Sequence, residues 1–162
     1  MIKSIISDVG GVLTIWDNIP LLEDIKNTFG ISEDQTKAVY NELVPSFGSG
    51  SISETEFWKR FMAKVNVKVK LPKKSLYLRK YAELVKINND VLNIFQNLKS
   101  HGYQLTALSN SYKPHTSFNK RSGFYDVFDL TILSDEVGLN KPDPKIFKLT
   151  LTKLGIKPEE AV

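Results

Sequence analysis

Three polar clusters in this sequence carry side chains suited to phosphoryl chemistry, and each of them follows a short apolar run. Asp8 ends the first run, Ser109 and Asn110 end the second, and Lys141 lies in a loop after the third. A carboxylate can attack phosphorus and form an aspartyl phosphate when nearby groups neutralise the phosphoryl charge. A serine hydroxyl can hold phosphoryl oxygens, and a lysine ammonium can supply the compensating charge.

The apolar runs before these clusters predict buried parallel strands at 2–7, 103–108 and 130–133. A helical pattern at 90–100 and a helix from about Pro144 alternate with them. Strands separated by helices need right-handed crossovers, so the expected fold is α/β with an open, doubly wound, Rossmann-like parallel sheet. Ligands of such sheets bind outside the carboxyl ends of the strands, which is where the three clusters fall.

The segment between the first two strands changes to a helical period, with four amphipathic patterns between about 19 and 85. Ser32 to Gln35 and Ser53 to Glu56 have the form of capping boxes. The alternating stretch from 65 to 71 predicts an extended connection or a short strand. We therefore expect an α/β core formed by 1–15 and 88–162, with a helical domain inserted at 16–87.

Each candidate residue also has a structural explanation when it is taken alone. An aspartate after a strand commonly forms a turn, a Ser-Asn pair commonly lies in a loop, and a lysine before proline is commonly exposed. Gly10 and Gly11 would allow a tight turn beside a ligand. The hypothesis of a site rests on the joint placement of Asp8, Ser109 and Lys141 at successive strand ends.

Composition excludes several other kinds of site. The sequence has no cysteine, which excludes disulfides, thiolate zinc sites and a cysteine nucleophile, and which fits a reducing cytoplasmic compartment. No apolar run has the length of a membrane span, so we expect a soluble, cytoplasmic protein without membrane contact. The net charge is +4, but the basic block at 64–80 has no recognition helix and no paired aromatics. We interpret that block as a solvated face and expect no nucleic-acid partner.

Three motifs together resemble those of the haloacid dehalogenase superfamily of hydrolases. Ile-Ile-Ser-Asp8-Val-Gly-Gly-Val-Leu-Thr14 resembles its first motif, and Leu105-Thr-Ala-Leu-Ser109-Asn110 is similar to the second. Gly138-Leu-Asn-Lys141-Pro-Asp-Pro144-Lys-Ile-Phe147 is similar to the third. Their order and spacing, with a helical insert between the first and second, resemble the subfamily that has a helical C1 cap.

The resemblance implies a Mg-dependent phosphatase of a small phosphorylated metabolite. It implies that Asp8 is the nucleophile and a Mg ligand, and that the Gly10 carbonyl is a second Mg ligand. Ser109 would bind phosphate, Asn110 would lie on the phosphate side, and Lys141 would neutralise charge. The helical insert would close over the site and select the substrate.

The sequence departs from the family pattern in two places. Many phosphatases of the family have an aspartate two residues after the nucleophile as general acid and base, and here that residue is Gly10. The family also continues past this point into a strand that ends in an acidic fourth motif, before which this sequence stops. We therefore expect an incomplete core sheet, weak Mg binding, little turnover by these 162 residues alone, and self-association through an exposed sheet edge.

Two alternative functions stay open, the first of them favoured by the missing fourth motif. One is a catalytically silent remnant that binds a partner or ligand through the cap. The other is a haloacid dehalogenase, which uses the same aspartate without a metal, although the aromatic residue usual at the second position after that aspartate is absent.

Overall fold

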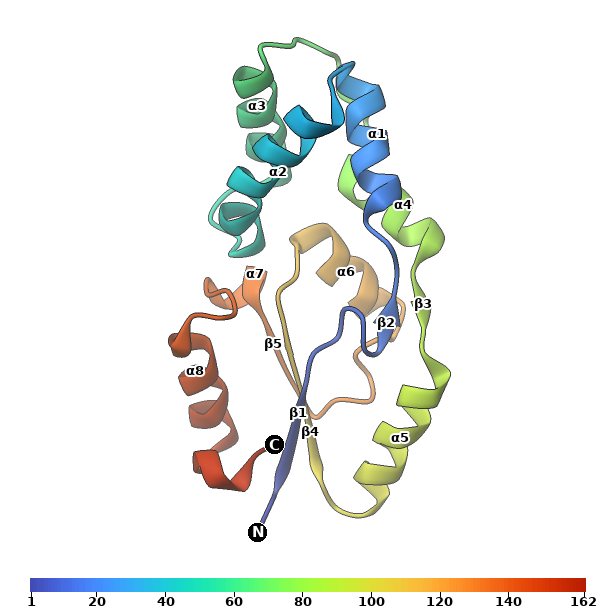
Figure 1. Cartoon of the computed structure of the whole chain (residues 1–162). Coiled ribbons are helices and arrows are strands. Elements are labelled where there is room, and N and C mark those ends of the chain that lie inside the picture. The colour runs from blue at the N-terminus through green and yellow to red at the C-terminus, as the bar shows by residue number, and fades with distance from the viewer.

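The computed structural model describes all of residues 1–162 and divides them into an α/β core and a helical lobe (Figure 1). The core sheet has three parallel strands in the order β1-β4-β5. They are β1 (Ser4–Ser7), β4 (Gln104–Ser109) and β5 (Leu130–Leu133). The helices of the core are α5 (Asn89–Ser100), α6 (Lys113–Arg121), α7 (Ser134–Val137), α8 (Pro144–Leu154) and the 3-10 turn η1 (Pro158–Glu160).

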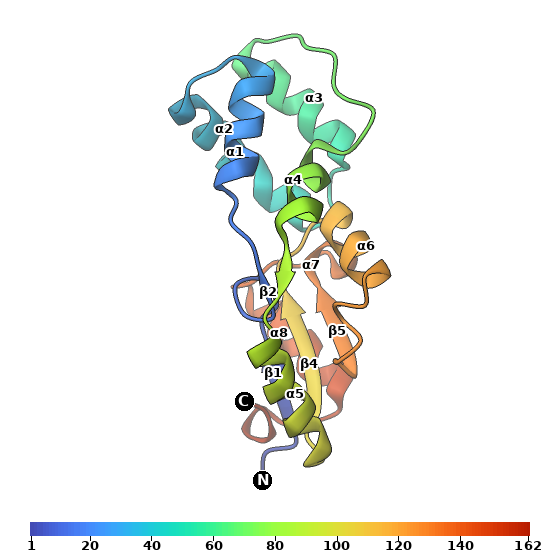
Figure 2. The ribbon, with the colours of Figure 1, turned by 90° about the vertical axis from the view of Figure 1, so that its right-hand side faces the viewer.

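Strand β4 lies in the middle of the sheet and is buried from Leu105 to Ser109. On one face, Leu105 and Ala107 pack in a cluster with Phe95 of α5. On the other face, Leu108 packs with Ile146 of α8. Helices α5 and α8 therefore cover opposite faces of the sheet, as both ribbon views show (Figures 1 and 2). The predicted doubly wound α/β fold is confirmed.

The helical lobe consists of α1 (Ile19–Phe29), α2 (Glu33–Gly48), α3 (Glu54–Val65) and α4 (Leu76–Leu84). It has its own aromatic-rich core, which includes Phe29, Phe47, Phe57, Trp58 and Tyr77. Residues 66–75 form a connection without a strand, so the short strand offered as one interpretation of 65–71 is absent, and Val65 ends α3.

Serine side chains cap the N-termini of two of these helices, α2 and α3. The Ser32 hydroxyl accepts the Gln35 N–H and the Gln35 side chain returns to Ser32, which completes the predicted capping box. The second predicted box is only half formed, because the Glu56 side chain pairs with Arg60 instead of returning to Ser53.

Two short segments that the sequence analysis did not identify connect the core to the lobe. They are β2 (Thr14–Ile15) and β3 (Lys86–Ile87), which pair antiparallel as Thr14↔Ile87 and Ile15↔Lys86. The chain leaves the core through β2 and returns through β3, so the lobe is joined to the core by one paired ribbon (Figure 1).

The free edge of β1 is partly covered in this structure, which corrects the expectation of an edge left unpaired along its length. The Ile6 N–H donates to the Val162 carbonyl at 2.7 Å, and the Val162 N–H donates to the Ser4 carbonyl at 3.1 Å. Residues 158–160 form a 3-10 turn that begins at Pro158. None of the helices is both long enough and apolar enough to cross a lipid bilayer.

Candidate active site

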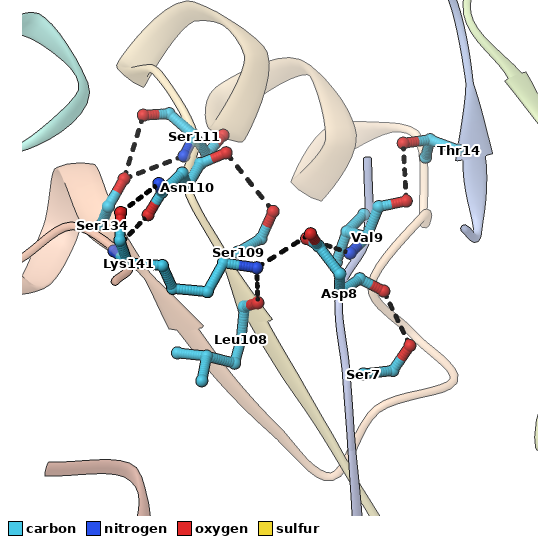
Figure 3. Close-up of polar contacts among 10 residues, drawn as sticks. All are labelled: Ser7, Asp8, Val9, Thr14, Leu108, Ser109, Asn110, Ser111, Ser134 and Lys141. Carbon is cyan, nitrogen blue, oxygen red and sulfur yellow. Dashed lines mark hydrogen bonds and ion pairs between the residues drawn. The ribbon is translucent and has the colours of Figure 1, made fainter. Parts of the chain in front are cut away.

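Asp8 is the first residue after β1 and lies at the carboxyl edge of the sheet (Figure 3). Its Oδ1 accepts the N–H of Val9 at 2.7 Å, which fixes the orientation of the carboxylate. The side chain is 44% exposed, so a carboxylate oxygen remains accessible to a ligand. The turn that follows is held by the Thr14 N–H and hydroxyl, which both donate to the Val9 carbonyl.

Lys141 reaches Asp8 from the loop after α7. Its Nζ lies 2.8 Å from Asp8 Oδ2 and donates to the Leu108 carbonyl, also at 2.8 Å. An ammonium has three donors, so two of them are engaged and one is available to an oxygen of a ligand. The side chain is 21% exposed, which places a fixed positive charge at the mouth of the site.

Asn110 holds the backbone of Lys141 from both sides. Its Nδ2 donates to the Lys141 carbonyl at 2.9 Å, and its Oδ1 accepts the Lys141 N–H at 2.7 Å. The amide side chain therefore bonds to the N–H and the C=O of one residue, as a neighbouring strand would. These two bonds fix the Lys141 loop, and the second N–H of Nδ2 remains available to a ligand.

Ser109 ends β4, which pairs with β1 in the register Ser7↔Ala107, so Ser109 and Asp8 lie at the same edge of the sheet. Ser109 is buried, and its hydroxyl makes one long hydrogen bond of 3.4 Å to the Asn110 carbonyl. A hydroxyl with such a weak partner can turn toward a phosphoryl oxygen. Figure 3 shows Ser109 beside Lys141 and facing the side on which Asp8 lies.

Gly10 offers a backbone oxygen two residues after Asp8. No backbone or side-chain group donates to its carbonyl. A carboxylate and a free carbonyl are hard oxygen ligands of the type that Mg²⁺ prefers, so the residues fit this cation in kind. The chain has no cluster of three or more His, Cys, Asp or Glu side chains that could hold a metal. Asp8 is therefore the charged side chain that this edge of the sheet offers as a ligand to a cation.

A cavity of about 810 Å³ lies between the lobe and the core beside Asn110. Its lining combines aromatic and aliphatic side chains with a few polar ones: Ile15, Trp16, Asp17, Asn18, Tyr40, Leu84, Lys86, Asn110 and Tyr112. Burial raises the pKa of both Tyr40 and Tyr112, so their hydroxyls stay protonated near neutral pH. The cavity therefore has an apolar wall, neutral hydroxyls and one side chain of each charge.

The haloacid dehalogenase-like hydrolase profile matches residues 2–162. The chain belongs to this family. The family prediction made from the three motifs is thereby confirmed, and the α/β core is that of a haloacid dehalogenase-like hydrolase.

Curated relatives of this hydrolase include a glyceraldehyde 3-phosphate phosphatase from Methanopyrus kandleri, 26% identical over the whole of this chain and 74% of the relative. A pyrophosphatase from Bacillus velezensis is 33% identical over 51% of this chain and 39% of its own length. A solved HAD family enzyme from Bacteroides thetaiotaomicron, in complex with magnesium and inorganic phosphate, has a TM-score of 0.80. It is 25% identical, and the match covers 99% of this chain and 83% of that one.

The structure brings the sequence-predicted residues Asp8, Ser109, Asn110 and Lys141 to one edge of the sheet, with Gly10 in the turn beside them (Figure 3). The cavity residues Trp16, Lys86 and Tyr112 are not among the site residues predicted from the sequence. Tyr112 follows Ser109 by three residues, and this short spacing was the one signal that could have pointed to it. Lys86 had no such signal, because the pairing of β2 with β3 places it.

Proposed function

We propose that this family member hydrolyses phosphate monoesters through an aspartyl phosphate on Asp8. The observation that carries the proposal is the 2.8 Å contact between Lys141 Nζ and Asp8 Oδ2 at the carboxyl edge of a parallel sheet. A nucleophilic carboxylate needs positive charge close to the phosphorus that it attacks, and Lys141 supplies that charge.

Each residue has a defined part in the two steps. In the first, a carboxylate oxygen of Asp8 forms a bond to phosphorus while the bond from phosphorus to the leaving-group oxygen breaks. In the second, water attacks the same phosphorus and releases inorganic phosphate and the free carboxylate. The Ser109 hydroxyl donates to a phosphoryl oxygen, and the Lys141 ammonium balances the charge.

The Asp8 carboxylate and the Gly10 carbonyl would hold Mg²⁺ at this edge. When bound, Mg²⁺ neutralises phosphoryl charge and helps to orient the group for in-line attack. The proposal takes support from the unpartnered Gly10 carbonyl and from the solved family enzyme with magnesium and phosphate. With one carboxylate in the ligand set, we expect binding to be weak, because Mg²⁺ would then depend largely on water ligands.

The cavity beside Asn110 indicates the substrate class. We propose a small phosphorylated metabolite whose leaving group enters the space between the lobe and the core and contacts Trp16, Lys86 and Tyr112. The volume suits a ligand of that size. The names of the relatives, a glyceraldehyde 3-phosphate phosphatase and a pyrophosphatase, agree with small phosphorylated compounds. In this proposal helices α1–α4 form the cap that covers the site.

The test is p-nitrophenyl phosphate hydrolysis with and without Mg²⁺, measured on the product of the full reading frame and on these 162 residues alone. The Asp8→Asn variant should lose turnover, because an amide is a poor nucleophile. Asp90→Asn, in the first turn of α5, is the matched control and should retain it. Turnover by Asp8→Asn equal to the wild type would remove the proposal. Metal-independent halide release from a 2-haloacid would favour the dehalogenase instead.

A further inference from the structure

The C-terminal end of helix α2 rests on the core through its last-turn carbonyl groups. The last four carbonyls of any helix have no partner within the helix. In α2 these include the carbonyls of Pro45 and Gly48, and the last turn carries no basic side chain to interact with its partial negative charge. The Pro45 carbonyl accepts the Ser49 N–H at 3.1 Å, whereas no backbone N–H reaches the Gly48 carbonyl, so any further donors to these two oxygens come from elsewhere in the molecule.

The core supplies them from two residues. The Ser134 hydroxyl donates to the Gly48 carbonyl at 2.6 Å, and the Asn140 Nδ2 donates to the Pro45 carbonyl at 2.8 Å. Gly48 lies beside this contact: a Cβ at residue 48 would meet Asn140 Oδ1 at 3.4 Å, an ordinary van der Waals distance. The end of α2 and the loop after α7 are therefore in direct contact.

Asn140 directly precedes Lys141, and the two residues face different partners. Asn140 binds the helical lobe at Pro45, whereas Lys141 binds the core through its peptide to Asn110 and through its ammonium to Asp8. A continuous series of hydrogen bonds thus runs from the end of α2 through residues 140 and 141 to the carboxylate at the sheet edge.

We propose that Asn140 is a positioning residue that couples the seating of the helical lobe on the core to the placement of the Lys141 ammonium. When the lobe is seated, the loop is held on both sides, by Pro45 and by Asn110. When the lobe lifts, the Pro45 contact is lost and the loop is held by Asn110 alone. The charge at Asp8 is then fully in place only in the closed molecule. The catalytic consequence rests on the proposed function, but the coupling itself does not.

Coupling between two contacts is reciprocal, so it can be measured from either end without turnover. The readouts are amide hydrogen exchange of Lys141, whose N–H is held by Asn110, and of Ser49, whose N–H donates to Pro45. We expect Asn140→Ala to speed exchange at Lys141 and Asn110→Ala to speed it at Ser49. The double variant should deviate from the sum of the two, because the contacts share one loop.

Ser100→Ala is the control. It removes a side-chain hydrogen bond within the core, from the Ser100 hydroxyl to the Asn97 carbonyl at 2.7 Å, at the end of α5 and away from the contact of the lobe with residue 140. It should leave the exchange of the Lys141 amide unchanged. Asn140→Gln, which keeps an amide donor, should restore part of the Lys141 protection that Asn140→Ala loses.

Kinetics separate positioning from folding. With p-nitrophenyl phosphate, Asn140→Ala should lower kcat by about 10-fold to 100-fold with little change in KM, since small displacements of a charged group cost rate. Unchanged Lys141 exchange in Asn140→Ala, or an equal increase in Ser100→Ala, would overturn the coupling whether or not the protein turns over. Loss of turnover in Asp8→Asn with no coupling at Lys141 would leave the proposed function standing and remove this inference alone.

Discussion

Lys141 Nζ lies 2.8 Å from Asp8 Oδ2 and also 2.8 Å from the Leu108 carbonyl, so one ammonium joins the ends of two neighbouring strands. The two acceptors fix the nitrogen on the side of Asp8 that faces Ser109 (Figure 3). The positive charge therefore does not depend on a flexible side chain finding its place after a ligand has bound.

Replacement of this ammonium tests its role. We expect Lys141→Met, which keeps the length of the side chain and removes the charge, to lower kcat/KM for p-nitrophenyl phosphate by at least about 100-fold. Steady-state kinetics measure the loss. Lys145→Met, on the first turn of α8, is the control and should stay near the wild-type value. A loss below about threefold for Lys141→Met would contradict charge neutralisation by Lys141.

Gly10 has room for a general acid. A Cβ built on Gly10 meets nothing within 4 Å, and its backbone is not in the left-handed region. We expect Gly10→Asp to speed hydrolysis of an alkyl phosphate, whose leaving group needs a proton, by about 10-fold or more relative to p-nitrophenyl phosphate. Gly10→Asn has a similar size without the acid and should leave that ratio unchanged. Equal ratios in the two variants would show that the added carboxyl group does not protonate the leaving group.

Much of the core was predictable from the sequence, and for physical reasons. Asp8, Ser109 and Lys141 follow apolar runs, and parallel strands bring their carboxyl ends to one edge. The strand at 130–133 has the predicted bounds and the last helix begins at Pro144 as predicted, because a short buried run and a proline in a first turn are strong local signals.

The other features of the fold and site depend on contacts between residues far apart in the sequence, which leave no local sequence pattern. The β2–β3 ribbon has two residues in each strand, too few for a periodic pattern, yet it places Lys86 opposite Ile15 at the cavity. Asn110 was predicted on the phosphate side, but whether its amide meets a ligand or the Lys141 peptide depends on the path of a loop 31 residues away. Asn140 had no signal, since its partner is a carbonyl of the helical lobe.

His115 should make the stability of the fold depend on pH. It is buried, stacks on Tyr81 at 3.7 Å, donates from Nε2 to the Tyr77 carbonyl, and has no acidic partner. Burial lowers its pKa from 6.5 to about 4. The unfolded chain takes up the proton below about pH 6.5 and the folded chain only near pH 4. The contribution to stability is therefore complete above pH 6.5 and falls as the pH drops toward 4.

From this difference in pKa, the free energy of unfolding should fall by up to about 3 kcal/mol across that range. Urea unfolding at several pH values measures it. His115→Gln keeps a donor for Tyr77 without the titration, so the difference between the wild type and this variant isolates the effect. A difference that stays constant from pH 7 to pH 4 would show that His115 is protonated alike in both states.

Gly50 lies where the helical lobe closely approaches the core. Its φ is +70°, and a Cβ there would lie 2.5 Å from the Asp135 carbonyl oxygen. Gly30 has a φ of +64° with open space around it, so Gly30→Ala measures backbone strain alone, at about 1 kcal/mol. Gly50→Ala adds a clash with backbone and should cost at least about 1 kcal/mol more. Denaturant unfolding compares the two variants. Equal losses in the free energy of unfolding would show that the lobe shifts to relieve the clash without loss of stability.

The central claim is that Asp8 carries the phosphoryl group between the two steps. The most direct measurement is a rapid acid quench of the protein from its full reading frame, mixed with p-nitrophenyl phosphate and Mg²⁺, followed by peptide mass spectrometry. The account predicts a single phosphoryl group on the peptide that contains Asp8, with no label in Asp8→Asn. Turnover without any phosphorylated peptide, or a phosphoryl group on another residue such as Ser109, would contradict it.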